Sequence, residues 1–337
     1  MESKQVHLEN GTPQLTPEFP GTPLGDRAAI WSLALVLGLV FLAYANTLGF
    51  QFVHDDDRIQ ILGNTWLRSW KYLPRYFTAD VWAFEHPGFR GTFYRPIFLV
   101  WFRLQYVIFG LKPWGWHLCT VLCHVGVTAL VYFTAARLLR DRLAALFTAL
   151  IFGLHPTHAE GVAWVSGVTE PLFAFFLFAS YLCYLKKRDE PERASFYLAC
   201  SLGLFALASL SKETAVVLPF IIFACEMLWS RGGRDAPGDT RFSDAPRAFK
   251  VSAPYLVISA LYMVARLLSL RGFQNTKEQH SYLSMILTWP SVLWFYVVHL
   301  MWPTRLSPFY TRVFYTQIDL HHVLLPAMAV LMVAAGL

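Results

Sequence analysis

Charged side chains are scarce in this sequence. Asp, Glu, Lys and Arg supply 15% of the 337 residues, whereas soluble domains contain about 25%. Apolar residues make up 55%, and they gather in long runs. The composition therefore excludes an ordinary soluble domain and predicts an all-α, multi-pass membrane protein. The net charge is +6, and the basic residues cluster in short links between the apolar runs. This pattern is typical of residues that orient a protein in the membrane, so no nucleic-acid partner is expected.

Polar loops lack cysteine, and the first apolar run lacks a cleavage site. All five cysteines lie inside apolar runs, so no disulfide framework is expected. The run at 28–50 is too long for a cleaved signal peptide and has no small-x-small site, so we predict an uncleaved first span. Residues 1–25, which are polar and rich in Pro, Gly and Thr, are expected to form a disordered cytoplasmic N-terminus.

The short basic segments between the apolar runs predict how the spans are oriented in the membrane, because cytoplasmic loops carry an excess of Lys and Arg. One membrane domain is expected over 26–337, with an external loop at 51–113 and a cytoplasmic loop at 230–250. Residues 94–111 contain two arginines, and a span there would place the basic links outside, so an interfacial or re-entrant helix is expected. The stretch 283–302 stays open. The predicted spans cover residues 28–50, 114–136, 143–157, 168–185, 194–210, 213–229 and 251–270.

Ionisable residues are few at mid-membrane, but many fall in the predicted external loops. A transporter or proton relay would be expected to place such groups inside the spans. The chain instead predicts a site at the outer interface, built from stretches far apart in sequence. The polar residues that converge there are Asp55, Asp56, Asp57, Asp80, Glu85, His86, Tyr94, Arg95, His155, His158, Glu160, Glu170, Lys212 and Glu213.

Carboxylates and cations in one site suit glycosyl transfer from a lipid-linked sugar phosphate. Asp55 or Asp56 would take the proton of an acceptor hydroxyl, and its pKa would be raised by the neighbouring acids. Arg95 and Lys212 would hold the phosphate and stabilise the charge that develops on it. The phosphate leaves as a stable anion, so no general acid and no cofactor are required. The residues leave the choice between Asp55 and Asp56 open.

Several of these residues also have ordinary explanations. Aspartates favour caps and turns, Arg95 could anchor a helix to lipid headgroups, and Lys212 with Glu213 could form a local ion pair. His155 and His158 could share a helix face as metal ligands. Glu160 would then point roughly 140° away from His155, so acceptor-binding or structural roles are favoured over a metal.

Six motifs occur in order between residues 50 and 312. They are FVHDDDRIQILGN, GTFYRPIFLVWFRLQY, KPWGWHLCTVLCH, FGLHPTHAEGVAWVSG, SKETAVVLPF and MWPTRLSPFY. Together they resemble the membrane region of the transmembrane-and-TPR O-mannosyltransferase family and its bacterial relatives, in the GT-C glycosyltransferase superfamily.

The resemblance implies a GT-C helical bundle and an inverting, metal-independent transfer of mannose or another hexose from a polyprenyl-phosphate donor. The acceptor would be a protein Ser/Thr or a glycan. The family's acidic pair matches Asp55 and Asp56, and Tyr94-Arg95, His155 to Glu160 and Lys212-Glu213 match other family motifs. Where relatives carry Gly-Arg-x-Asp, this chain has Gly167-Val168-Thr169-Glu170, which puts the donor-phosphate or acceptor contacts there in doubt.

Two other functions stay open. A transporter or flippase of a lipid-linked precursor would use the acids as a cation-attracting vestibule, and a non-catalytic assembly protein would fit the missing arginine. The expected location is a bacterial inner membrane or an endoplasmic reticulum membrane, with a cytoplasmic N-terminus and an extracytoplasmic site. Because the chain ends inside an apolar run, we expect a C-terminal truncation, with further spans or TPR repeats beyond it.

Overall fold

The computed structural model describes residues 26–53, 57–85, 91–229, 244–271, 281–304, 306–307, 310 and 313–336. Within these ranges the chain forms helices and no strands, which confirms the predicted all-α class. Asp55 and Asp56 lie outside the described residues, as does much of the stretch predicted to be a cytoplasmic loop at 230–250. Helix α11 already begins at Ala245, inside that stretch.

Six segments are long and apolar enough to cross a membrane, in the part of the chain that the structure describes. They confirm a multi-pass membrane protein. The stretch 283–302, left open from the sequence, contributes one of them. The six are Asp26–Gly49, Pro113–Leu139, Val165–Asp189, Pro191–Ser211, Ala245–Leu270 and Tyr282–Met301.

Helices α4 (Pro96–Phe109), α6 (Arg142–Leu154) and α10 (Leu218–Trp229) are apolar but shorter than a full crossing usually requires. They contain 14, 13 and 12 residues, or about 18–21 Å of helix against a hydrocarbon core of about 30 Å. Helix α6 ends where it does because Pro156 disfavours a helical conformation at His155, whose ψ is 127°. The predicted crossings at 143–157 and 213–229, and the interfacial or re-entrant placement of α4, stay predictions.

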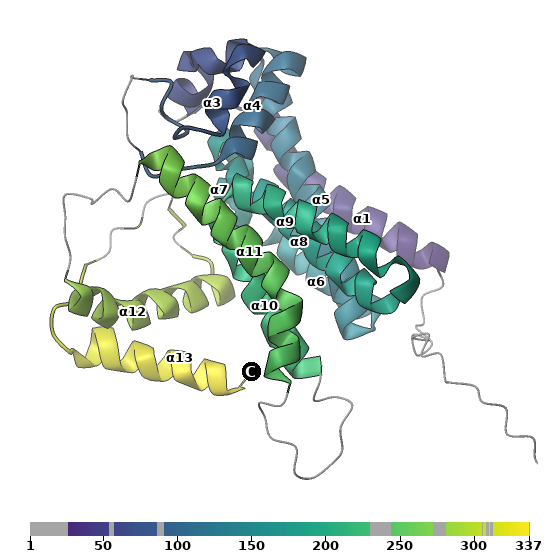
Figure 1. Cartoon of the computed structure of the whole chain (residues 1–337), viewed down its shortest axis with the longest axis vertical. Coiled ribbons are helices and arrows are strands. Elements are labelled where there is room, and N and C mark those ends of the chain that lie inside the picture. Colours follow the sequence, from purple (N-terminus) through teal and green to yellow (C-terminus); the bar gives the residue numbers. More distant parts are fainter. Residues whose placement is uncertain are drawn as a thin grey trace, which may run out of the picture.

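Two helical groups form most of the bundle (Figure 1). Helix α1 (Asp26–Tyr44) packs with α5 (Pro113–Leu139) and α6 around Val36, Tyr132 and Ala149. Helices α8 (Thr169–Asp189), α9 (Ala194–Ser211), α10 and α11 (Ala245–Leu270) share a second core. Helices α12 (Tyr282–Met301) and α13 (Leu325–Gly336) contact each other beside the bundle.

A small aromatic subdomain lies at the end of the bundle where α3 (Leu73–Tyr76) and α4 are drawn in Figure 1. Its core contains Trp66, Tyr76, Phe102 and Trp116, all nearly inaccessible to solvent. Arg103, the charge inside apolar α4, donates through Nη1 to the Leu67 carbonyl at 2.7 Å. The first predicted external loop is therefore a packed scaffold that carries its own charged residue inward, and it forms one wall of the site described next.

Candidate functional site

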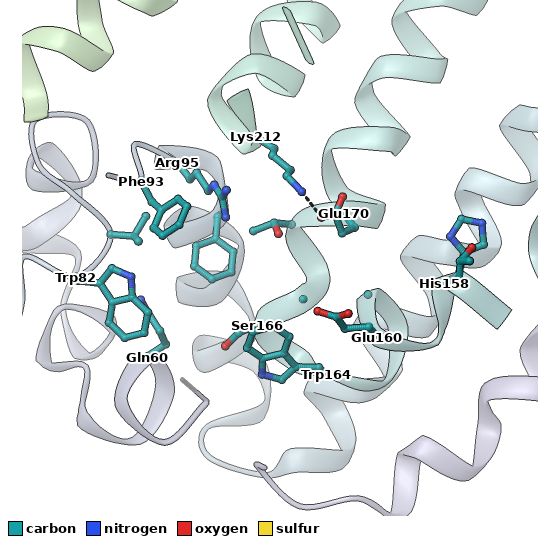
Figure 2. A pocket seen from close by; sticks show the side chains of 16 residues that line it. Gln60, Trp82, Phe93, Arg95, His158, Glu160, Trp164, Ser166, Glu170 and Lys212 are labelled. Carbon is teal, nitrogen blue, oxygen red and sulfur yellow. Dashed lines mark hydrogen bonds and ion pairs between the residues drawn. The ribbon is translucent and has the colours of Figure 1, made fainter. Parts of the chain in front are cut away.

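A cavity of about 430 Å³ opens between the aromatic subdomain and the ends of the bundle helices (Figure 2). Four separate stretches form its walls. They are the π-helical turn η2 (Arg58–Gly63), the loop before α4, the segment that enters α8, and the turn after α9. The lining residues are Gln60, Val81, Trp82, Phe93, Arg95, Phe98, Thr157, His158, Glu160, Gly161, Trp164, Ser166, Gly167, Thr169, Glu170 and Lys212.

Five of the residues predicted from the sequence line this cavity: Arg95, His158, Glu160, Glu170 and Lys212. They come from three stretches of the chain between Arg95 and Lys212, so the fold brings together what the sequence only suggested. Tyr94, His155 and Glu213 do not line the cavity. Tyr94 is buried and its hydroxyl donates to the Phe77 carbonyl, which makes it part of the supporting wall.

Both cations of the site are held by carboxylates. Lys212 forms an ion pair and hydrogen bond with Glu170, drawn as the dashed line in Figure 2. Arg95 donates to Glu213 through Nε at 3.1 Å and Nη2 at 2.7 Å, a bidentate geometry that orients the guanidinium. The adjacent residues Lys212 and Glu213 thus do not pair with each other, and each is bound to another segment of the chain.

The Arg95–Glu213 pair shifts the titration of the carboxylate. Burial alone would raise the pKa of Glu213, but hydrogen bonds and charge from Arg95, with a further contribution from Arg266, leave the pKa below its ordinary value. Nη1 of Arg266 lies 3.8 Å from Oε2 of Glu213. Glu213 is consequently ionised at neutral pH, and Arg95 stays oriented beside the cavity.

The pKa values of Glu160 and His158 are both shifted toward the neutral form of the side chain. Burial, reinforced by the nearby charge of Glu170 and opposed by Lys212, raises the pKa of Glu160. Burial, with the neighbouring imidazoles of His124 and His155, lowers the pKa of His158 to about 4. His158 is therefore neutral at pH 7 and supplies a hydrogen-bonding ring, so the positive charge of the cavity comes from Arg95 and Lys212.

Asp57, the last residue of the acidic segment Asp55–Asp57, is bound to the wall of the cavity. Its side chain is fully buried, and Oδ1 accepts hydrogen bonds from the Ser166 amide at 2.9 Å and the Ser166 hydroxyl at 2.7 Å. Ser166 itself lines the cavity. The third aspartate therefore joins the segment after the first span to the turn η6 (Val165–Val168), which enters α8.

The stretch Gly167 to Glu170, where the chain departs from the family pattern, is tightly packed. A Cβ on Gly167 would lie 3.0 Å from the Glu160 carbonyl oxygen and 3.2 Å from Cα of Gly161, so a larger residue would force the two turns slightly apart. Three residues later the longer acid, Glu170, reaches Lys212. The departure thus places a carboxylate on the cation of the neighbouring turn.

Asp80 shapes the opposite wall. Its two carboxylate oxygens accept hydrogen bonds from the amides of Trp82 and Phe93, each at 2.8 Å, and so close the loop that presents both aromatic side chains to the cavity. Burial raises the pKa of Asp80 despite these bonds. A Cβ on Gly91 would lie 2.5 Å from the carboxylate, so the loop requires glycine there.

Sequence reasoning missed the neutral lining residues, including Gln60, Trp82, Phe93, Trp164 and Ser166. Gln60 had a usable signal, because it is a polar residue inside the apolar stretch that follows the three aspartates. The aromatic residues had none, since aromatic side chains occur throughout the chain.

A second cavity of about 440 Å³ adjoins the first, and both are lined by Thr157 and Glu160. Its other walls are mainly aromatic and come from α12 and the segment after it. His155 helps to hold this side together, because its Nε2 is 2.9 Å from the Leu300 carbonyl and its Nδ1 is 2.8 Å from the Thr157 hydroxyl. The lining residues are Pro156, Thr157, Ala159, Glu160, Phe295, Tyr296, His299, Leu306, Ser307 and Tyr310.

No group of three or more His, Cys, Asp or Glu side chains is placed to hold a metal ion, within the ranges that the structure describes. Asp55 and Asp56 lie outside those ranges, so the expectation of a metal-independent site stays a prediction.

Comparison with known proteins supports the resemblance drawn from the motifs. The model of the dolichyl-phosphate-mannose-protein mannosyltransferase family matches residues 94–237. Protein O-mannosyl-transferase Tmtc1 of Drosophila melanogaster is 34% identical over 198 residues, which cover 58% of this chain and 23% of that protein. Tmtc2 of the same species is 37% identical over 185 residues, or 53% of this chain and 20% of the relative.

Human protein O-mannosyl-transferase TMTC3 is 30% identical over 203 residues, covering 59% of this chain and 22% of the relative. The chain thus matches only about a fifth of the length of these curated relatives. No solved structure matches the chain. The family resemblance is confirmed, and the family model covers residues 94–237.

Proposed function

We propose that the protein is a membrane glycosyltransferase that moves a hexose such as mannose from a polyprenyl-phosphate donor to a hydroxyl acceptor, with protein Ser/Thr as the favoured acceptor. The observation that carries the proposal is the pair of cations, Arg95 and Lys212, that line one cavity, whose wall residue Ser166 is bound to Asp57. The similarity to protein O-mannosyl-transferases supports the choice of sugar and acceptor.

In the proposed reaction the acceptor oxygen attacks the anomeric carbon as the bond from that carbon to the phosphate oxygen breaks. The acceptor proton passes to the carboxylate of Asp55 or Asp56, and the polyprenyl phosphate leaves as an anion. The configuration at the anomeric carbon inverts, because nucleophile and leaving group lie on opposite faces. Asp55 and Asp56 are assigned to this cavity because they directly precede Asp57, which is bound to the cavity wall through Ser166.

Arg95 and Lys212 are both proposed to bind the donor phosphate, each in a different way. Arg95 is oriented by its bidentate partner Glu213, so it offers a fixed donor geometry. Lys212 is paired with Glu170, a carboxylate with 54% of its side chain exposed, and a phosphate would compete for the ammonium. Charge that develops on the leaving phosphate would strengthen both interactions in the transition state.

The acceptor is proposed to enter from the second cavity. Glu160 and Thr157 line both cavities, so this junction is where acceptor and donor would meet. The aromatic walls suit an apolar or extended peptide segment that presents its hydroxyl to the junction. The proposed setting is a multi-pass protein of the bacterial inner membrane or the endoplasmic reticulum, with the N-terminus cytoplasmic and the site on the extracytoplasmic side.

The test is transfer by the purified, reconstituted protein from polyprenyl-phosphate mannose to Ser/Thr peptides, with products identified by mass spectrometry. Asp55→Asn and Asp56→Asn are measured separately, and at least one is expected to lose about a hundredfold or more in rate. Asp26→Asn, which changes an aspartate with 85% of its side chain exposed and outside the cavity, serves as the control. Full rates in both site variants would refute the base assignment, and flux of lipid-linked sugar without product would favour a flippase.

A further inference from the structure

Gln60 combines a place in the wall of the first cavity with a buried, unpaired amide oxygen. Its side chain is 2% exposed and lines the cavity, yet Oε1 has no hydrogen-bond partner among the described residues. Buried polar atoms in native proteins are nearly always hydrogen-bonded, because an orphaned carbonyl has lost its water without a replacement. Because Gln60 is also a wall residue of the cavity, a ligand in that cavity can supply the missing donor.

The position of Gln60 separates it from the charged end of the cavity. In Figure 2, Gln60 and Trp82 lie on one side, while Arg95 and Lys212 lie toward the other end. Gln60 belongs to the π-helical turn η2, and π-helical turns are frequent at functional sites. The hydroxyl of Ser166, another lining residue, donates to Asp57 and so does not satisfy the Gln60 oxygen.

The end of the cavity that contains Gln60 and Trp82 suits a neutral ligand that carries hydroxyl groups. A phosphate oxygen carries no proton to donate and prefers the cations. A sugar hydroxyl donates one hydrogen bond to an amide oxygen, and the half-buried indole of Trp82 offers an apolar face for the ring. The cavity therefore divides into an anion-binding end and a neutral, hydroxyl-binding end.

We propose that Gln60 accepts a hydrogen bond from a ring hydroxyl of the donor sugar, with Trp82 against the sugar face, so that this end of the cavity selects the sugar. The inference deepens the proposed function and rests on it for the identity of the donor. A site built to hydrogen-bond a hydroxyl rejects analogues that lack it, because the buried group is then left unpaired.

The test compares Gln60→Met, which keeps the length and removes the amide, with the wild type. Binding is measured to three ligands: polyprenyl-phosphate mannose, its monodeoxy analogues, and polyprenyl phosphate without sugar. Gln60→Met is expected to weaken binding of the mannose ligand about tenfold and to leave polyprenyl phosphate unchanged. One monodeoxy analogue should bind equally to both proteins.

Gln105 provides a matched control, because it is also a 2%-exposed glutamine whose amide atoms have no partner among the described residues. It lies on α4 and lines neither cavity, so Gln105→Met should leave all three affinities unchanged. If Gln60→Met does not fold, Gln60→Asn replaces it, because asparagine is one carbon shorter and moves the amide away from the ligand. The same three affinities are then compared with those of the wild type.

The outcomes separate this inference from the proposed function. An equal loss for all three ligands, or no loss for any, would overturn the role of Gln60 even if the wild type transfers sugar. If the wild type transfers no sugar but prefers the mannose ligand to polyprenyl phosphate, and Gln60→Met loses that preference, the sugar site stands and glycosyl transfer fails.

Discussion

Removing the charge of Glu213 should destabilise the protein in a pH-dependent way. In Glu213→Gln, the Arg95 guanidinium, with only 15% of its side chain exposed, keeps one hydrogen bond but loses its counterion. Removing one partner of a fully buried pair costs about 3–5 kcal/mol, and a hydrogen bond to a charged group contributes about 1.5–3 kcal/mol. Because Glu213 is 30% exposed and Gln retains an acceptor, we expect a loss of about 2 kcal/mol.

That loss corresponds to a decrease of about 3 °C in melting temperature for a chain of this length, measured by thermal unfolding of the purified protein in detergent. The pKa of Glu213 is lower in the folded state, so its stabilising effect is complete above the ordinary value of 4.5 and disappears as the pH falls through the lowered pKa. The gap between wild type and variant should therefore close on acidification below 4.5.

Glu192→Gln is the matched control, because Glu192 is an exposed glutamate outside both cavities. It should change the melting temperature by less than about 1 °C at neutral pH. The argument is wrong if Glu213→Gln melts with the wild type at pH 7, or if its deficit persists undiminished once the pH is below the lowered pKa.

Three further predictions concern the walls of the cavity. Gly167→Ala should cost about 1–3 kcal/mol in thermal unfolding, because its Cβ would press on the Glu160 carbonyl, and an unchanged melting temperature would contradict the packing. Ser166→Ala removes one of the two hydrogen bonds that Ser166 donates to Asp57 and should cost about 1 kcal/mol, whereas a stability gain would disprove the tether. Lys212→Met should weaken binding of polyprenyl phosphate about tenfold, as measured by thermal shift, and equal binding would remove Lys212 from the phosphate site.

The sequence was enough to predict the helical class and the gathering of several polar residues, because both follow from run lengths and from the order of polar and apolar segments. It could not predict which charges pair. Lys212 and Glu213 are neighbours in the chain, yet Lys212 binds Glu170 and Glu213 binds Arg95. Those partners depend on how α4, α8 and α9 pack, which sequence spacing does not define.

Gln60 illustrates a different limit. A glutamine is ordinary in a helical turn, and its importance arises only when packing buries it and leaves Oε1 without a donor beside a cavity. Likewise, Pro156 ends α6, but the close approach of Gly161 and Gly167, which both line the cavity, depends on how two separate turns pack. Features that depend on the contact of distant segments thus appear only in the folded chain.

The central claim is that the cavity and its acidic segment transfer a sugar to protein hydroxyls. The most direct measurement is mass spectrometry of membrane glycopeptides from cells that produce the wild type, the Asp55→Asn/Asp56→Asn double variant, or neither. O-linked hexose on Ser or Thr is expected with the wild type and is expected to be absent in the other two. Identical glycopeptides in all three samples would contradict the account.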